Sequence, residues 1–252
     1  MSGDTRPVAL VTGASYGLGA AIAARLAGDG FDVAVTELDP ADLADTRAAI
    51  EAAGGGSEGV ALDLRSDASI AAAVNAVLDR FGRIDLLVNN AAMLVAKPAL
   101  DVAAAEFEAV TRINVTGTFL MTQHVGRHLI ESGRPGQIIN IASTFTTVGA
   151  VNVSPYGISK AAIGGLTRHL AAEWAPHDIR VNAVAPGTSM TKLRAEIFDN
   201  DDARREAGLS KIPLGRFTDP EDIAGAVSYL ASPAAAYVTG HILAVDGGMT
   251  VT

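Results

Sequence analysis

The chain has 252 residues, 49% of them hydrophobic, which is enough to bury a large core, so we expect residues 1–252 to form one domain. It contains no cysteine, which excludes disulfides, thiolate catalysis and cysteine metal sites and fits a cytoplasmic protein. The net charge of -9, with no basic cluster and no apolar run of the ~20 residues that span a bilayer, argues against nucleic-acid and membrane partners.

Short β-branched runs alternate with longer alanine-rich stretches of helical periodicity along the chain. Strands are expected at residues 8–12, 33–36, 60–62, 86–88, 137–142, 180–184 and 242–245. Helices are expected at residues 17–29, 41–53, 66–81, 103–131 and 155–174, and after Pro220. This alternation predicts an α/β fold with a doubly wound parallel sheet of about seven strands and helices on both faces.

The first expected strand is followed by the glycine-rich turn Thr12-Gly13-Ala14-Ser15-Tyr16-Gly17-Leu18-Gly19. Glycine permits unusual φ values and close backbone approach, and the start of the next helix offers free N–H groups to a pyrophosphate. A tight connection is the ordinary explanation of such a turn. The strand before it and the helix after it favour a dinucleotide site.

Glu37 lies at the end of the second expected strand, eighteen residues beyond Gly19. A carboxylate at this position can accept hydrogen bonds from both ribose hydroxyls of an adenosine. It would also repel a 2′-phosphate, and no Arg or Lys lies between Arg25 and Arg47 to attract one. We therefore predict NAD as the cofactor in preference to NADP.

Tyr156 and Lys160 stand four residues apart in an expected helix, so they share one face of it. Ser154 is the expected N-cap and Pro155 the first helical residue, which places Tyr156 in the first turn. Ser143 lies thirteen residues before Tyr156, just beyond the fifth expected strand. A surface Tyr and Lys would explain the pair alone, whereas its position in an α/β nucleotide-binding chain predicts an acid/base centre.

At these residues the chain resembles, over essentially its whole length, the short-chain dehydrogenase/reductase family, whose domain is a Rossmann fold. The glycine turn is similar to the family's cofactor motif, and Asn90-Ala91-Ala92 departs from its usual Asn-Ala-Gly only by a methyl group. The resemblance implies the catalytic set Asn114, Ser143, Tyr156 and Lys160. It implies the cofactor-binding set Gly13, Ser15, Tyr16, Gly17, Leu18, Gly19, Glu37, Leu38, Asp63, Leu64, Asn90, Ala91, Ala92, Tyr156, Lys160, Pro186, Gly187, Ser189 and Thr191.

The resemblance also implies a role for each catalytic side chain. Tyr156 would exchange a proton with the substrate oxygen, and its phenol, with an ordinary pKa near ~10, would be helped to ionise by the Lys160 ammonium. Ser143 would hydrogen-bond the substrate oxygen, and Asn114 would help to hold a water that links Lys160 to solvent.

These expectations describe an NAD-dependent oxidoreductase that transfers a hydride between a secondary alcohol, such as a sugar or polyol, and nicotinamide. Two alternatives remain open: a 3-oxoacyl thioester reductase that uses NADP(H), and a catalytically retired NAD-binding scaffold or sensor. The resemblance further implies a substrate lid at about residues 189–213 and a homotetramer. His124 and His128 are four apart, but no third ligand is placed near them, so no metal site is predicted.

Overall fold

The computed structural model describes residues 6–189 and 202–251, and it contains one seven-stranded sheet with the strand order β3-β2-β1-β4-β5-β6-β7. Every neighbouring pair of strands is parallel. The strands are β1 (Val8–Thr12), β2 (Asp32–Glu37), β3 (Ser57–Ala61), β4 (Leu86–Asn89), β5 (Gly136–Ile141), β6 (Ile179–Pro186) and β7 (Ile242–Val245). The predicted doubly wound parallel sheet is confirmed.

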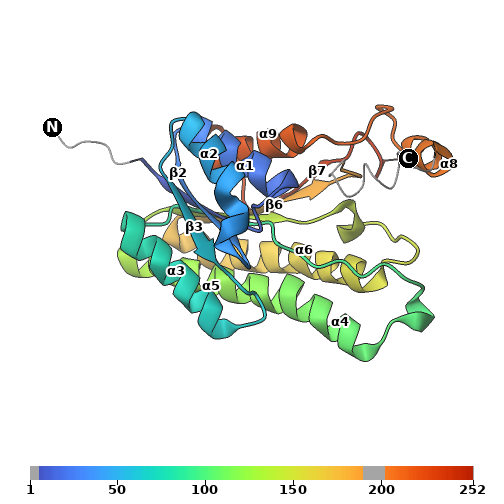
Figure 1. The fold of residues 1–252 in the computed structure, drawn as a ribbon, viewed down its shortest axis with the longest axis horizontal. Helices are drawn as coiled ribbons and strands as arrows, with labels where there is room; N and C mark the ends of the chain where they lie inside the picture. The colour runs from blue at the N-terminus through green and yellow to red at the C-terminus, as the bar shows by residue number, and fades with distance from the viewer. Residues whose placement is uncertain (1–5, 190–201, 252) are drawn as a thin grey trace.

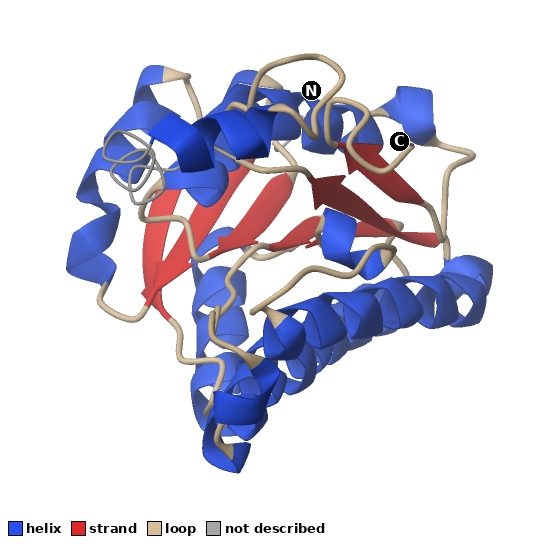
Figure 2. Ribbon diagram, turned by 90° about the vertical axis from the view of Figure 1, so that its right-hand side faces the viewer, coloured by secondary structure: helices blue, strands red, loops and turns tan. Residues whose placement is uncertain are grey.

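Helices cover both faces of this sheet (Figures 1 and 2). One face carries α1 (Gly17–Gly28), α2 (Ala44–Ala52) and α9 (Pro220–Ala231), and the other carries α3 (Asp67–Phe81), α4 (Ala104–Thr111), α5 (Thr118–Ser132) and α6 (Ser154–Trp174). A separate hydrophobic core fills the space on each side, with Ile22 and Val227 in one and Val74 and Leu129 in the other. A further helix, α8 (Asp202–Leu209), lies beyond β6 along the chain.

The third strand begins earlier than residues 60–62, where it was expected. Ser57 and Gly59 pair with Val33 and Val35 of β2, so the strand runs from Ser57 to Ala61. Serine and glycine have a low preference for strands, and here pairing with a buried neighbour decides the conformation.

The helical stretch expected over residues 103–131 runs from Ala104 to Ser132, but it is not one regular α-helix. Between α4 and α5 the chain forms a π-helical turn, η3 (Arg112–Gly117), and Asn114 lies inside it. The turn packs closely on the chain after β3, since a Cβ at Gly117 would lie 2.7 Å from the carbonyl oxygen of Leu64. Such turns are rare and occur often at functional sites. Hydrophobic periodicity alone does not reveal them.

Trp174 is buried at the end of α6. A Cβ at Gly126 of α5 would lie 2.5 Å from the indole ring. Within residues 6–189 and 202–251, none of the helices has the length and hydropathy needed to cross a membrane.

Candidate active site

The predicted site residues lie at the carboxyl ends of the strands, around the point where the order of the sheet reverses. From β1 the chain continues to β2 and β3 on one side, whereas β4 pairs with the other side of β1 and starts the series to β7. Ligands of open α/β sheets bind in the crevice at this switch point.

The glycine-rich turn between β1 and α1 has the close backbone contacts of a phosphate cradle. Gly13 and Gly17 have φ values of 65° and 61°, and a Cβ at Gly19 would lie 2.3 Å from the carbonyl oxygen of Gly13. Asn90, at the end of β4, holds the turn by donating its Nδ2–H groups to the carbonyl oxygens of Thr12 and Gly13, at 3.0 and 2.7 Å. Gly13 and Gly19 therefore have no room for a side chain.

Helix α1 begins directly after this turn, at Gly17, and its N-terminus suits an anion. Tyr16 occupies the N-cap position without a side-chain cap hydrogen bond, and the first turn contains no acidic residue. The N–H groups there and the positive end of the helix dipole favour a bound phosphate. The residues present thus fit the pyrophosphate of a dinucleotide.

Ala92, the departure from the family pattern, lies beside the turn without backbone strain. Among the described non-glycine residues, only Asn152 and Asp178 have a positive φ. The methyl group of Ala92 is therefore compatible with its backbone, and Ala91 packs directly against Gly13.

Glu37 ends β2 close to the glycine-rich turn. The Ser15 hydroxyl donates to Oε2 of Glu37 at 2.7 Å, and the backbone N–H of Leu38 donates to Oε1 at 3.0 Å. The side chains of Tyr16 and Leu38 are exposed beside it. Each carboxylate oxygen thus has one donor within the protein.

Asp63 and Leu64 follow β3 at the same edge of the sheet. Arg65 donates to both carboxylate oxygens of Asp63, at 2.9 Å from Nε and 2.8 Å from Nη2. These hydrogen bonds lower the pKa of Asp63 below its ordinary value. Leu64 is buried beneath this turn, against Gly117 of the π-helical segment.

Tyr156 and Lys160 lie one turn apart on α6, as expected. The helix begins at Ser154, with Val153 as its N-cap, so the prediction of Ser154 as the cap is wrong by one residue. Lys160 is 4% exposed, and its Nζ lies 5.5 Å from the centroid of the Tyr156 ring and donates to the carbonyl oxygen of Ile141 at 2.6 Å. Burial lowers the pKa of Lys160 from 10.5 to about 8.

Ser143 is buried two residues beyond the end of β5, where it caps a short 3-10 turn, η4 (Thr144–Thr146). Its Oγ accepts a hydrogen bond from the N–H of Phe145 at 3.3 Å. The rings of Phe145 and Tyr156 meet edge to face with their centroids 6.2 Å apart. The turn that carries Ser143 therefore packs on the first turn of α6.

Asn114 is 2% exposed and joins two other parts of the site. Its side chain exchanges two hydrogen bonds with the backbone of Met93, at 2.7 and 2.9 Å, and donates to Oγ of Ser159 at 2.9 Å. The Ser159 hydroxyl in turn donates to the carbonyl oxygen of Tyr156 at 2.7 Å. The four residues of the predicted catalytic set are thus linked within one region.

The remaining predicted cofactor residues lie where β6 ends. Pro186 closes the strand, and the N–H of Gly187 donates to the carbonyl oxygen of Val245 at 3.0 Å. Ser189 is buried and forms an isolated bridge with Thr218. Thr191 and residues 190–201 of the expected lid at 189–213 lie outside the described residues.

Two residues with structural roles at this site were not predicted, Thr46 and Ser159. The Thr46 hydroxyl, on α2, donates to the carbonyl oxygen of Ala14 in the glycine-rich turn at 2.7 Å. No local pattern connects residues 32 positions apart. Ser159 directly precedes Lys160, but a serine inside a helix ordinarily bonds only its own helix backbone.

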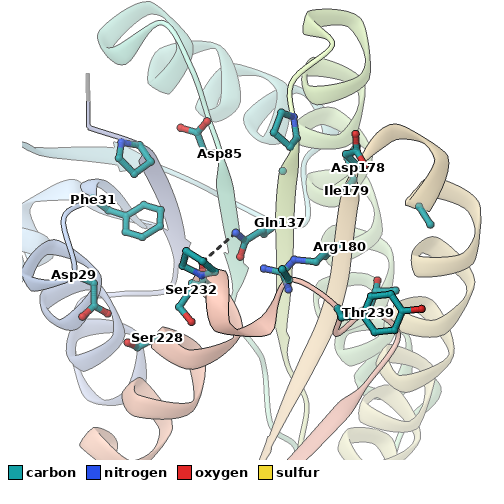
Figure 3. A pocket seen from close by; sticks show the side chains of 18 residues that line it. Asp29, Phe31, Asp85, Gln137, Asp178, Ile179, Arg180, Ser228, Ser232 and Thr239 are labelled. Carbon is teal, nitrogen blue, oxygen red and sulfur yellow. Dashed lines mark hydrogen bonds between the residues drawn. The ribbon is translucent and has the colours of Figure 1, made fainter. Parts of the chain in front are cut away.

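A cavity of about 1220 Å³ lies at the other edge of the sheet (Figure 3). Its wall includes Phe31, Gln137, Ile179 and Arg180, from the amino-terminal ends of the strands, and none of the predicted site residues. We place the active site at the carboxyl edge despite the size of this cavity, because the hydrogen-bonded acid/base groups are there. Among the described residues, no three His, Cys, Asp or Glu side chains are grouped to hold a metal ion.

Comparison with known proteins shows which family the chain resembles over nearly its whole length. Residues 13–250 match the family described as enoyl-(acyl carrier protein) reductase. The chain is 40% identical to D-threitol dehydrogenase of Mycolicibacterium smegmatis over 97% of its length and 93% of that protein.

Two solved structures share the whole fold. One is a point variant of actinorhodin polyketide ketoreductase with NADPH, which has a TM-score of 0.92 and 36% identity over 100% of both chains. The other is 3-ketoacyl-(acyl-carrier-protein) reductase from Brucella melitensis with NADH, which has a TM-score of 0.89 and 35% identity over 97% of this chain and 98% of that one.

Proposed function

Because this chain belongs to the short-chain dehydrogenase/reductase family, whose members use a nicotinamide cofactor, we propose that it is an NAD-dependent dehydrogenase of secondary alcohols. The observation that carries the proposal is the buried Lys160 ammonium, one turn from Tyr156 on α6 and 5.5 Å from its ring. This pair lies at the same edge of the sheet as the glycine-rich turn.

Tyr156 is the proposed general acid and base. During oxidation its phenolate oxygen would take the hydroxyl proton of the alcohol, and during reduction its phenol would return a proton to the carbonyl oxygen. Lys160 favours the phenolate by its positive charge. With a pKa of about 8, Lys160 is still mainly protonated at pH 7.

Ser143 and Asn114 are the proposed supports of this proton transfer. Ser143 lies in the turn that packs on Tyr156 through Phe145, so its hydroxyl can hydrogen-bond the substrate oxygen and stabilise the charge that develops there. Asn114 bonds directly to the backbone of Met93 and to the Ser159 hydroxyl of α6. Ser159 in turn bonds to the carbonyl oxygen of Tyr156, so this chain of hydrogen bonds holds the first turn of α6 in place. A water held near Asn114 would complete the path from Lys160 to solvent.

The cofactor would lie across the switch point between β1 and β4. The glycine-rich turn and the N-terminus of α1 would hold the pyrophosphate, Glu37 the adenosine ribose, and Asp63 and Leu64 the adenine side. Pro186, Gly187 and Ser189 would meet the nicotinamide end. When bound, the nicotinamide accepts or gives the hydride. Glu37 favours NAD, since its charge would repel the 2′-phosphate of NADP.

The proposed substrate is a sugar, a polyol or another small hydroxy compound, and similarity to the D-threitol dehydrogenase supports this class. Similarity to the Brucella reductase supports a second candidate function, reduction of a 3-oxoacyl thioester. The two differ in the substrate that must reach Tyr156, so a substrate panel distinguishes them.

A homotetramer in the cytoplasm completes the proposal. Three aromatic or aliphatic side chains, Phe107 of α4, Phe119 of α5 and Ile158 of α6, are exposed on the helices of one face of the sheet. Large apolar side chains exposed on the helices of one face suit a subunit contact. Sedimentation velocity of the purified protein tests this part of the proposal.

The experiment that tests the function measures NADH formation from a panel of polyols, sugars and other secondary alcohols, and NADH or NADPH consumption with 3-oxoacyl thioesters. The Tyr156→Phe variant is compared with the parent protein. We expect one alcohol class to give turnover with NAD+, and the variant to lose at least about a thousandfold in kcat, because its ring has no proton to exchange. NADH binding should remain within about twofold of the parent.

Two outcomes would contradict the proposal. Tight NADH binding without turnover of any alcohol or ketone would support a retired scaffold. A Tyr156→Phe variant that keeps most of its activity would require a different proton donor.

A further inference from the structure

We propose that Ser15 is a positioning residue for cofactor choice: its hydroxyl fixes the Glu37 carboxylate in the orientation that accepts the adenosine ribose and repels a 2′-phosphate. The inference rests on the proposed use of NAD. In this role Ser15 affects cofactor binding indirectly, by orienting Glu37. Any direct contact of the glycine-rich turn with the cofactor phosphates is separate from it.

The hydrogen bonds around Glu37 leave two acceptor positions free on its carboxylate, which is the number that the two hydroxyls of a ribose need. Ser15 Oγ donates to Oε2 at 2.7 Å and the N–H of Leu38 donates to Oε1 at 3.0 Å. A carboxylate has about two acceptor positions on each oxygen. One position on each oxygen remains, which matches the 2′- and 3′-hydroxyls of one ribose.

Ser15 can orient Glu37 because the backbone of the preceding residue, Ala14, is fixed from two sides. The N–H of Ala14 donates to the carbonyl oxygen of Thr36, at the end of β2, at 3.1 Å. The carbonyl oxygen of Ala14 accepts from the buried hydroxyl of Thr46 on α2 at 2.7 Å. The turn is therefore attached to the same strand end that carries Glu37, and the distance between the Ser15 and Glu37 side chains is set by the fold.

Without the hydroxyl, one oxygen of Glu37 loses its donor within the protein. The remaining bond comes from Leu38, the adjacent residue, which constrains the side chain less than a bond across the crevice. The carboxylate can then rotate away from a 2′-phosphate, and repulsion between like charges weakens as their separation grows. We expect Ser15→Ala to bind NADH about fivefold more weakly and to lower the NADH preference about tenfold.

A double-mutant cycle tests this inference by binding alone. Dissociation constants for NADH and NADPH are measured by nucleotide fluorescence for the parent, Ser15→Ala, Glu37→Ala and the double variant. If Ser15 acts through Glu37, the ratio of the two constants changes about tenfold on Ser15→Ala in the parent, and less than about twofold in the Glu37→Ala background. The matched control is Ser69→Ala, since the Ser69 hydroxyl accepts from the N–H of Asp63 on the adenine side. It should weaken both cofactors alike.

The outcomes separate this inference from the proposed function. A parent that prefers NADH, with an unchanged ratio in Ser15→Ala or an equal change in both backgrounds, overturns the role of Ser15 and leaves NAD use intact. A parent that prefers NADPH overturns the NAD proposal and this inference together.

Discussion

At the scale of single residues, Lys160 is the most unusual group of the site. It is 4% exposed, and its ammonium has one hydrogen bond of known geometry, to the carbonyl oxygen of Ile141. Burial favours its neutral form and lowers its pKa to about 8. The shift represents a penalty of roughly 3 kcal/mol for keeping the charge in this position at neutral pH. The protein thus retains the charge beside Tyr156 at a cost in stability.

The penalty predicts a pH dependence of stability with a definite sign. In the unfolded chain Lys160 regains its ordinary pKa of 10.5, so between about pH 8 and 10.5 the unfolded chain holds a proton that the folded chain has released. The contribution of Lys160 to folding stability therefore rises with pH through this window, and is lowest below it. We expect Lys160→Met to be more stable than the parent at pH 7, with the difference shrinking as the pH approaches 10.5.

Urea unfolding at a series of pH values from 7 to 10.5 measures this difference. The control is Lys211→Met. Lys211 is exposed, so the same substitution there removes a solvated positive charge and not a buried one. A difference between Lys160→Met and the parent that does not vary with pH would show that the ammonium is not penalised by burial.

At the scale of elements, the π-helical segment η3 (Arg112–Gly117) connects the two halves of the site. Gly117 contacts Leu64 on the adenine side, and Asn114 reaches Ser159 on α6. Arg112 adds hydrogen bonds to the carbonyl oxygen of Arg65 and an ion pair with Asp67. Movement of this segment would therefore change both the adenine side and the Tyr156 turn.

The segment also shows where reasoning from the sequence stops. The position of Tyr156 and Lys160 on one helix face follows from their spacing, and the glycine-rich turn follows from its strand and helix neighbours. The π-helical turn has no hydrophobic pattern that distinguishes it from an α-helix, and its contact between Leu64 and Gly117 joins residues far apart in the chain. The same reason explains why Thr46 and Ser159 were not predicted, and why β3 begins at Ser57.

Ser159→Ala is the variant that tests the link between η3 and α6. It removes the acceptor of the Asn114 amide and the donor to the carbonyl oxygen of Tyr156. We expect kcat to fall about tenfold with KM for the alcohol nearly unchanged, because a misplaced Tyr156 affects the transition state more than substrate binding. The midpoint of the pH profile of kcat should also move, since the surroundings of Tyr156 change.

Ser154→Ala is the matched control, on the first turn of the same helix and partly exposed. It should leave both kcat and its pH profile close to those of the parent. If Ser159→Ala lowers stability but changes neither kinetic quantity, Ser159 is only a packing residue.

At the scale of the whole molecule, the sheet order brings the two halves of the chain to one crevice. The strands β1 to β3 carry the glycine-rich turn, Glu37 and Asp63, whereas β4 to β6 lead to Asn90, Ser143 and Pro186. The halves meet where Ala9–Val11 pairs with Leu86–Val88. Alternation of strands and helices was sufficient to predict a doubly wound parallel sheet, because a parallel sheet needs a crossover between successive strands.

A cofactor that spans this crevice should stabilise both halves together. We expect one unfolding transition on heating, seen at the same temperature by Trp174 fluorescence and by far-UV circular dichroism, since both cores pack on one sheet. NADH at 100 times its dissociation constant should add about 2.7 kcal/mol to the free energy of unfolding. For a chain of this size that corresponds to a rise in Tm of roughly 5–10 °C.

The control is the Gly19→Val variant. Its valine side chain would fill the cradle beside Gly13, so its Tm should not respond to NADH. Because an oligomer adds a concentration dependence, all samples are compared at one protein concentration. Two separate transitions, or a shift in the fluorescence signal alone, would mean that the halves unfold independently and that residues 1–252 do not behave as one domain.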